Sequence, residues 1–375
     1  MAGQLVDDRA TLLWRVLEHE ALTDRAWDVG QAEAAVAEIV ADGESAVADG
    51  GWPAHGLDDE PESSRIIVVE ADVRYPSDSG LTLDGARSLV SEAKKLTALV
   101  GGGAGRVRDR TRAIGRRLRM ISKTMGRRTG ERKQEVLRLT QEAGEQLGRS
   151  LREARRLAIR ARRSARGRGA SAKLAAVKRL EEIADRAERV VLQIKRRLAG
   201  EPNPNRLVSM VDPEARPIRK GKLGKPNEFG YVAQICEVTQ NTQRGARGFI
   251  VPASIKLGSP NETQLLPDTV SELDRLGLRP REVAVDGGFE NRPTTDALEL
   301  LAPDRVFIAG RQQPGSRRTQ RRLARYRTGA EGRISHLKRG YGMRRSRLKG
   351  QDGMKTWTGW AILAYNLDTL AIRTN

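Results

Sequence analysis

Residues 327–338 read Arg-Thr-Gly-Ala-Glu-Gly-Arg-Ile-Ser-His-Leu-Lys, and we expect them to form part of one helix. Because an α-helix has 3.6 residues per turn, Arg327, Glu331 and Lys338 return to the same face. A stripe with one acid between two cations is most often a surface ion pair. The alternative interpretation is a functional carboxylate flanked by cations that hold an anionic substrate.

A second carboxylate with a distinctive setting lies upstream, in the sequence Glu-Val-Ala-Val-Asp-Gly-Gly-Phe at 282–289. The β-branched run predicts a short buried strand, and the two glycines predict that it ends directly after Asp286. Asp286 is therefore expected as a carboxylate at the end of a strand.

These two segments resemble the second and third parts of a DDE transposase core, because strand-Asp-Gly-Gly-Phe is followed by the spacing Arg-x3-Glu-x6-Lys. The resemblance is to bacterial insertion-sequence transposases of the ISNCY type; it covers roughly residues 66–375 and is most specific near the C-terminus. It implies an α/β fold with an RNase H-like mixed sheet. It also implies double-stranded DNA as the partner, and metal-dependent strand cleavage and strand transfer at the ends of an insertion sequence.

The order of the segments predicts several parts. Residues 1–62 form an acidic segment, weakly ordered or non-native, and 63–80 contain the first core strand. Leu and Ile at three- and four-residue steps predict a basic helical insertion over 81–200. Alternating short strands and helices predict the RNase H-like core over 201–350, and an apolar-striped helix over 351–375 is expected to cover it.

Strand transfer with two divalent metals requires about three carboxylates from separate elements. The resemblance implies Asp286 and Glu331 as two catalytic, metal-holding residues, with Mg2+ or Mn2+ as the cofactor. The first should fall at position 65, but Arg65 stands there and Ile67 replaces a Thr, which predicts an impaired or inactive enzyme. Asp212, expected at the end of an apolar strand, is the substitute third ligand; its alternative role is a turn residue before Pro213. Asp72 and Asp78 are weaker candidates.

The distribution of charge predicts a polyanionic partner. The formal net charge is +20, yet residues 1–62 hold 15 acidic and only 3 basic residues, so the remainder carries a net +32. Nucleic acid is the first partner this favours and an anionic membrane the second. Eight arginines crowd residues 152–168, where contact with DNA phosphate would relieve their repulsion. Near the active site, the expected DNA-binding residues are Arg327, Lys338, Arg333, Arg317, Arg318, Arg321, Arg322, Arg344 and Arg345.

Other classes of protein are disfavoured by composition. No apolar run is long enough for a membrane span, and no secretory signal is evident, so we expect a cytoplasmic protein. Cys236 is the only cysteine and the three histidines are far apart, which excludes an internal disulfide and a Cys/His metal cluster. A homodimer is a further expectation.

Three functions compete on the sequence. The leading one is a DDE transposase, and the alternative is a non-catalytic, basic DNA-binding relic of such an enzyme, which Arg65 favours. A helical RNA-binding protein is the third, suggested by residues 100–200 alone; it does not account for the set of Asp286, Glu331 and Lys338.

Overall fold

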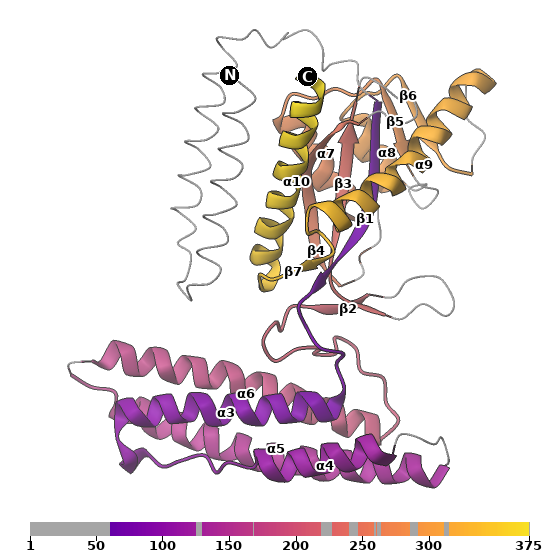
Figure 1. Cartoon of the computed structure of the whole chain (residues 1–375). Helices are drawn as coiled ribbons and strands as arrows, with labels where there is room; N and C mark the ends of the chain where they lie inside the picture. Colours follow the sequence, from indigo (N-terminus) through magenta and orange to yellow (C-terminus); the bar gives the residue numbers. More distant parts are fainter. Residues whose placement is uncertain are drawn as a thin grey trace.

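The described part of the chain forms two bodies, a helical bundle and a mixed sheet covered by helices (Figure 1). This computed structural model describes residues 61–374 except 125–129, 168, 219–226, 240–246, 259, 261–263, 286–291 and 311–314. The acidic N-terminal segment expected over residues 1–62 therefore lies almost entirely outside the described residues. In the sheet body the strands are β1 (Pro61–Ala71), β2 (Arg216–Ile218), β3 (Glu228–Val238), β4 (Phe249–Leu257), β5 (Glu282–Val285), β6 (Arg305–Ile308) and β7 (Arg345–Ser346). The helices there are α7 (Leu266–Arg275), α8 (Arg292–Glu299), α9 (Arg317–Gly340) and α10 (Gly350–Thr374).

The sheet mixes parallel and antiparallel pairs, as expected for an α/β fold. Its strands run in the order β2-β3-β1-β5-β6, with β4 pairing β3 and β7 pairing β1. The pairs β1–β3 and β3–β4 are antiparallel, whereas β1–β5 and β5–β6 are parallel. Strands β3 and β4, which follow one another in the chain, form one of these antiparallel pairs. Strand β1 begins at Pro61, two residues before the expected start of the core.

Alternation along the strands divides the sheet into two apolar faces. On one face Ile67, Val69 and Tyr231 pack beneath α9 and α10, which contribute Leu337 and Tyr365. On the other face, buried residues of β3 and β5 pack against α7 and α8. The apolar stripe of α10 therefore covers this face of the sheet.

The bundle consists of α3 (Asp78–Val100), α4 (Thr111–Thr124), α5 (Gly130–Ser164) and α6 (Ala170–Leu198), which lie between β1 and β2 in the chain. Helix α3 begins at Asp78, three residues before the expected start of the helical region. The bundle has its own apolar core, in which Leu89, Leu147 and Leu180 are fully buried. Each such side chain contributes about 1.5–3 kcal/mol by leaving water. Among the described helices of the chain, none is both long and apolar enough to cross a membrane.

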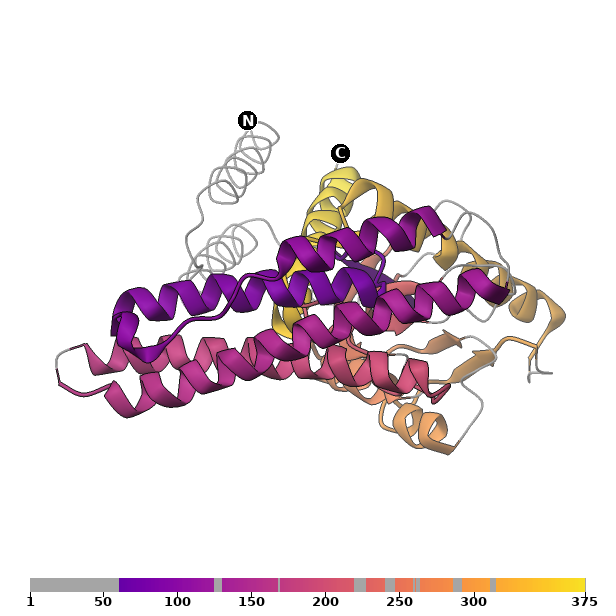
Figure 2. The ribbon, with the colours of Figure 1, turned by 90° about the horizontal axis from the view of Figure 1, so that it is seen from below.

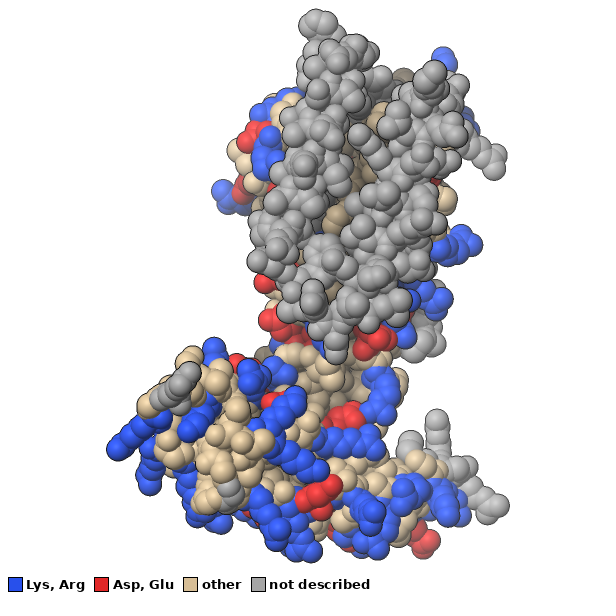
Figure 3. Space-filling view, turned by 60° about the vertical axis from the view of Figure 1, so that its left-hand side comes forward, with Lys and Arg blue, Asp and Glu red and all other residues tan. Residues whose placement is uncertain are grey.

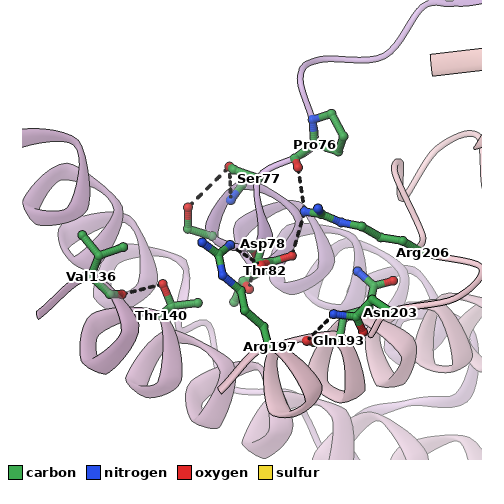
Figure 4. Close-up of polar contacts among 12 residues, drawn as sticks. Pro76, Ser77, Asp78, Thr82, Val136, Thr140, Gln193, Arg197, Asn203 and Arg206 are labelled. Atoms are coloured by element: carbon green, nitrogen blue, oxygen red, sulfur yellow. Dashed lines mark hydrogen bonds and ion pairs between the residues drawn. The ribbon is translucent and has the colours of Figure 1, made fainter. Parts of the chain in front are cut away.

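The entrance and exit of the bundle are held together at Asp78 (Figure 4). Ser77 caps α3 by accepting a hydrogen bond from Gly80 N, and the adjacent Asp78 is 4 % exposed. Its carboxylate pairs with Arg197 at the end of α6 at 2.6 Å and with Arg206 in the exit segment at 2.9 Å. These two ion pairs place the segment leaving β1 beside the segment that returns to the sheet.

The strand expected over residues 207–212 is absent, so that prediction was wrong. Leu207 and Met210 instead pack into the bundle core, while Val208 packs against the sheet. Side chains satisfy the backbone of this segment, because Leu207 N donates to Gln193 Oε1 at 2.6 Å and Arg186 donates to Met210 O at 3.1 Å. The apolar residues therefore join the two bodies of the protein, and sheet pairing begins only at Arg216.

Candidate functional site

Helix α9 carries Glu331, and contacts on both sides of that residue fix the helix to the sheet. Near its start, Arg322 donates to both carboxylate oxygens of Glu282 on β5, at 2.7 and 2.5 Å. One turn later the Tyr326 hydroxyl donates to the backbone oxygen of Glu237 on β3, at 3.2 Å. Farther along, Leu337 is buried in the core beneath the helix. The backbone of α9 is thus held across β5 and β3.

A buried ion pair completes this attachment. Arg333 Nε donates to Glu237 Oε1 at 2.8 Å, and the same oxygen accepts from Gly248 N at 2.9 Å. The side chain of Glu237 is 4 % exposed and that of Arg333 is 17 % exposed. Glu237 was not singled out in the sequence, although a lone carboxylate inside the apolar strand Tyr-Val-Ala-Gln-Ile-Cys-Glu-Val is a signal that could have identified it.

The side chains of the two predicted carboxylates, Asp286 and Glu331, lie outside the described residues, but the elements next to them are described. Strand β5 ends at Val285, directly before Asp286, which lies outside the described residues. Glu331 falls within α9, but its side chain lies outside them too. Since α9 packs on β5 and β1, the structure brings together the two elements that lead to these residues. The separation of the two carboxylates stays a prediction.

Strand β1 lies between β5 and β3 and contains position 65. Its parallel register with β5 pairs Ser63 with Ala284, and its antiparallel register with β3 pairs Arg65 with Ile235. Strand β1 therefore lies next to the strand that precedes Asp286. The side chain of Arg65 is outside the described residues.

Asp212, the expected substitute ligand, is 3 % exposed and engaged with its neighbours. Its Oδ1 accepts a hydrogen bond from the Tyr231 hydroxyl at 2.6 Å and a longer one from Gly350 N at 3.4 Å. Burial, together with the Asp212 hydrogen bond, raises the pKa of Tyr231. These contacts give Asp212 a structural role between β3 and the start of α10, and its metal-binding role stays a prediction.

The position of Asp212 along the sheet bears on that role. Tyr231 pairs with Val69, four residues along β1 from Arg65. Four residues of extended strand span about 13 Å. This is much longer than the distance of about 4 Å between two catalytic metals, so the position of Asp212 does not favour a metal-binding role. Beside Asp212 a hollow of about 360 Å³ is lined by Val211, Pro213, Glu214, Lys349, Gly350, Gln351 and Asp352.

The expected DNA-binding cations fall into three groups. Arg333, Arg322 and Arg345 form ion pairs, with Glu237, with Glu282, and with both Glu70 and Asp72. Arg327 and Lys338 are half-buried on α9. Arg317, Arg318, Arg321 and Arg344 are exposed. The exposed group provides cations that a phosphate can reach without breaking a described ion pair.

A divalent metal would need oxygen ligands from the segments just described. Within the described part of the chain, no three His, Cys, Asp or Glu residues are grouped as a metal site. Asp286 and Glu331 offer hard carboxylate oxygens of the kind Mg2+ and Mn2+ prefer. The donor chemistry of these two residues fits a single ion with water completing its shell, and a two-metal centre needs a further carboxylate.

Comparison with known proteins identifies one related domain. Residues 219–367 match the family model described as the transposase DDE domain, a region that begins just after β2 and ends within α10. Neither the curated proteins nor the solved structures contain a match to this chain. The family match supports a DDE-type transposase, and it includes both Asp286 and Glu331.

Proposed function

We propose that this protein is a DDE transposase of an ISNCY-like insertion sequence, which cleaves and transfers DNA strands on an RNase H-like core. The transposase DDE domain match over residues 219–367 carries the proposal. Two structural relationships support it: β5 leads directly to Asp286, and the helix that contains Glu331 is fixed across that same strand. Double-stranded DNA is the substrate.

The chain's own residues would divide the work at this centre. Asp286 and Glu331 would hold Mg2+ or Mn2+, which supplies a more acidic attacking water or 3′-hydroxyl and stabilises the leaving oxygen. Arg327, one turn before Glu331, and Lys338, two turns after it, would hold phosphates and balance the carboxylate charge. The Glu237–Arg333 pair would fix the helix so that Glu331 keeps its place.

The first carboxylate is the point on which activity depends. If the β1–β5 register continues two residues beyond Ser63 and Ala284, Arg65 falls level with Asp286. Arginine has no acceptor for a metal, so the proposed centre lacks one ligand. Asp212 is the other candidate for that ligand. Its hydrogen bond with Tyr231 favours a structural role for Asp212, and therefore a centre in which the ligand is missing. We therefore expect the unmodified chain to cleave DNA weakly or not at all.

A second function is favoured by the same residue. With Arg65 at this register, the chain can keep the DNA affinity of the fold without its chemistry and act as a non-catalytic DNA-binding protein. The positive charge of residues 63–375 suits this function as well as it suits a transposase. The two functions differ only in whether metal-dependent cleavage can be obtained from the core.

Nicking of a supercoiled plasmid in Mg2+ or Mn2+ separates them. The double substitution Arg65→Asp with Ile67→Thr should raise the rate of nicking, and adding Asp286→Asn or Glu331→Gln should abolish the gain. Asp304→Asn, which changes an exposed carboxylate that pairs with Arg281 at 3.4 Å, is the matched control and should leave the gain unchanged. Absence of any gain from the double substitution would favour the non-catalytic function.

A further inference from the structure

Two sets of cations in the bundle differ in their position and in their partners. Those facing a neighbouring helix pair with acids: Arg110 with Glu153, Arg117 with Glu142, Arg155 with Asp185 and Glu188, and Arg162 with Glu181. These contacts join α5 to the segment leading into α4, to α4 itself and to α6. Acidic residues thus neutralise the cations between helices.

The outward faces of α4 and α5 carry the other set. At helical steps of three or four, α5 presents Arg149, Arg152, Arg156, Arg160 and Arg163, and α4 presents Arg112, Arg116, Arg119 and Lys123; all nine are exposed. We call these nine residues the outer cationic face. None of the nine forms an ion pair with a described residue. On α4 they lie opposite the buried Ile114 and Ile121.

This arrangement costs stability in the isolated protein. Like charges four residues apart on a helix destabilise it by about 0.2–0.5 kcal/mol per pair, and the outer cationic face contains several such pairs. On α4 the cations also border a hollow of about 230 Å³, lined by Arg116, Arg119, Met120 and Lys123. An anion bound along this face would relieve the repulsion.

The location of the outer cationic face separates it from the candidate active site. Helices α4 and α5 lie on the side of the bundle away from the sheet (Figure 1), and they are in front when the molecule is seen from below (Figure 2). Figure 3 shows Lys and Arg side chains spread over the surface of the bundle. From Arg149 to Arg163 the stripe on α5 spans about 21 Å. A linear polyanion matches this length better than a small anion does.

We propose that the outer cationic face binds the phosphate backbone of duplex DNA, at a segment other than the one cut at the sheet. This inference rests on the proposed function for its choice of DNA as the polyanion. Guanidinium groups at successive turns would contact phosphates without reading bases, so the binding is independent of sequence. Each neutralised phosphate releases counterions, so the contacts weaken steeply with salt.

The test measures DNA binding by the full chain at a series of salt concentrations. Binding is read from the fluorescence anisotropy of a labelled mixed-sequence duplex, in EDTA so that no cleavage occurs. The stripe variant carries Arg152→Gln, Arg156→Gln and Arg160→Gln. The control variant carries Lys94→Gln, Lys178→Gln and Lys195→Gln, which remove the same charge from exposed positions on α3 and α6. Because the stripe substitutions remove repulsion, the variant should melt no lower than the unmodified protein.

We expect the slope of log affinity against log salt to fall by about 2.7 in the stripe variant, since each lost contact with B-form DNA removes about 0.9. In the control variant the slope should fall by less than about 0.9, the amount expected for one contact. Equal slopes in the unmodified protein and the stripe variant would overturn the inference while leaving the transposase proposal intact, as would equal losses in both variants. If an RNA duplex binds as tightly as the DNA duplex and loses the same salt slope in the stripe variant, the outer cationic face is not specific for DNA and the inference fails. Failure of the unmodified chain to bind any duplex would count against both proposals.

Discussion

Arg333 on α9 donates its Nε hydrogen to Oε1 of Glu237 on β3, at 2.8 Å, and both side chains are largely removed from water. Arg333 lies two residues after Glu331, so this pair fixes the part of the helix on which the proposed chemistry depends. The charge of Arg333 neutralises a buried carboxylate, which distinguishes Arg333 from exposed cations such as Arg318.

Replacing Arg333 should destabilise the protein strongly. Arg333→Ala leaves the Glu237 carboxylate buried without its cation, and breaking a buried pair in this way costs about 3–5 kcal/mol. The free energy of unfolding, measured by urea denaturation, is the readout. Arg339→Ala, which changes an exposed residue of the same helix that bonds to Ser335, is the control and should cost much less. A loss below about 1 kcal/mol for Arg333→Ala would show that the pair is not buried as described.

Tyr231 and Asp212 provide a second test of buried polar contacts. Tyr231→Phe removes the hydroxyl that bonds Asp212 at 2.6 Å and leaves the carboxylate one partner short. The expected cost is about 1–3 kcal/mol of stability, read from urea denaturation.

The same pair separates the two roles of Asp212 in the Arg65→Asp background. If the role is structural, Asp212→Asn lowers stability and plasmid nicking persists at a temperature where the variant is folded. Loss of nicking in a variant that melts normally would instead make Asp212 a metal ligand.

The Arg110–Glu153 pair predicts a pH dependence of bundle stability. The hydrogen bond from Arg110 lowers the pKa of Glu153 below its ordinary 4.5, with burial opposing and Arg108 N contributing in the same direction. A lowered folded-state pKa stabilises fully above 4.5, and the stabilisation is lost as the pH falls through the folded value. Glu153→Gln should therefore lower the melting temperature at neutral pH, by an amount that shrinks below pH 4.5. The exposed Glu182→Gln is the control, and a Glu153→Gln effect independent of pH would contradict the pairing.

Substitutions of the cations at the start of α9 should affect either DNA binding or stability, depending on whether the cation forms an ion pair. Gln substitution of Arg317, Arg318 or Arg321, all exposed, should reduce the salt slope of duplex binding by about 0.9 each and leave the melting temperature unchanged. Arg322→Gln should instead lower the melting temperature, because Arg322 pairs with Glu282, whose side chain is 12 % exposed. The reverse pattern, with Arg322 affecting only binding, would mean that the Glu282 pair does not hold α9.

Much of the fold could be predicted because its signals are local. Helical spacing of Leu and Ile predicted the helical region over 81–200, and the β-branched run before Asp286 predicted β5. The strand expected before Asp212 failed because an apolar run does not reveal which core receives it. Leu207 and Val208 enter different cores, and their backbone partners, such as Gln193, come from distant parts of the chain.

The candidate site shows the same division. The spacing of Arg327, Glu331 and Lys338 is visible in the sequence because one helix contains all three. The pairing of Glu237 with Arg333 joins residues nearly a hundred positions apart, and a strand glutamate alone does not name its partner. Likewise, the sorting of bundle arginines into paired and outward-facing sets depends on which helices are neighbours.

The most direct test of the account is the position of bound Mn2+ in crystals of the Arg65→Asp variant, located by anomalous scattering. The account predicts a peak within coordination distance of the carboxylates of Asp286 and Glu331, on the side of the sheet where α9 packs on β1 and β5. Carboxylates more than about 10 Å apart, too far to share a two-metal site, or a peak at Asp212 instead, would contradict it.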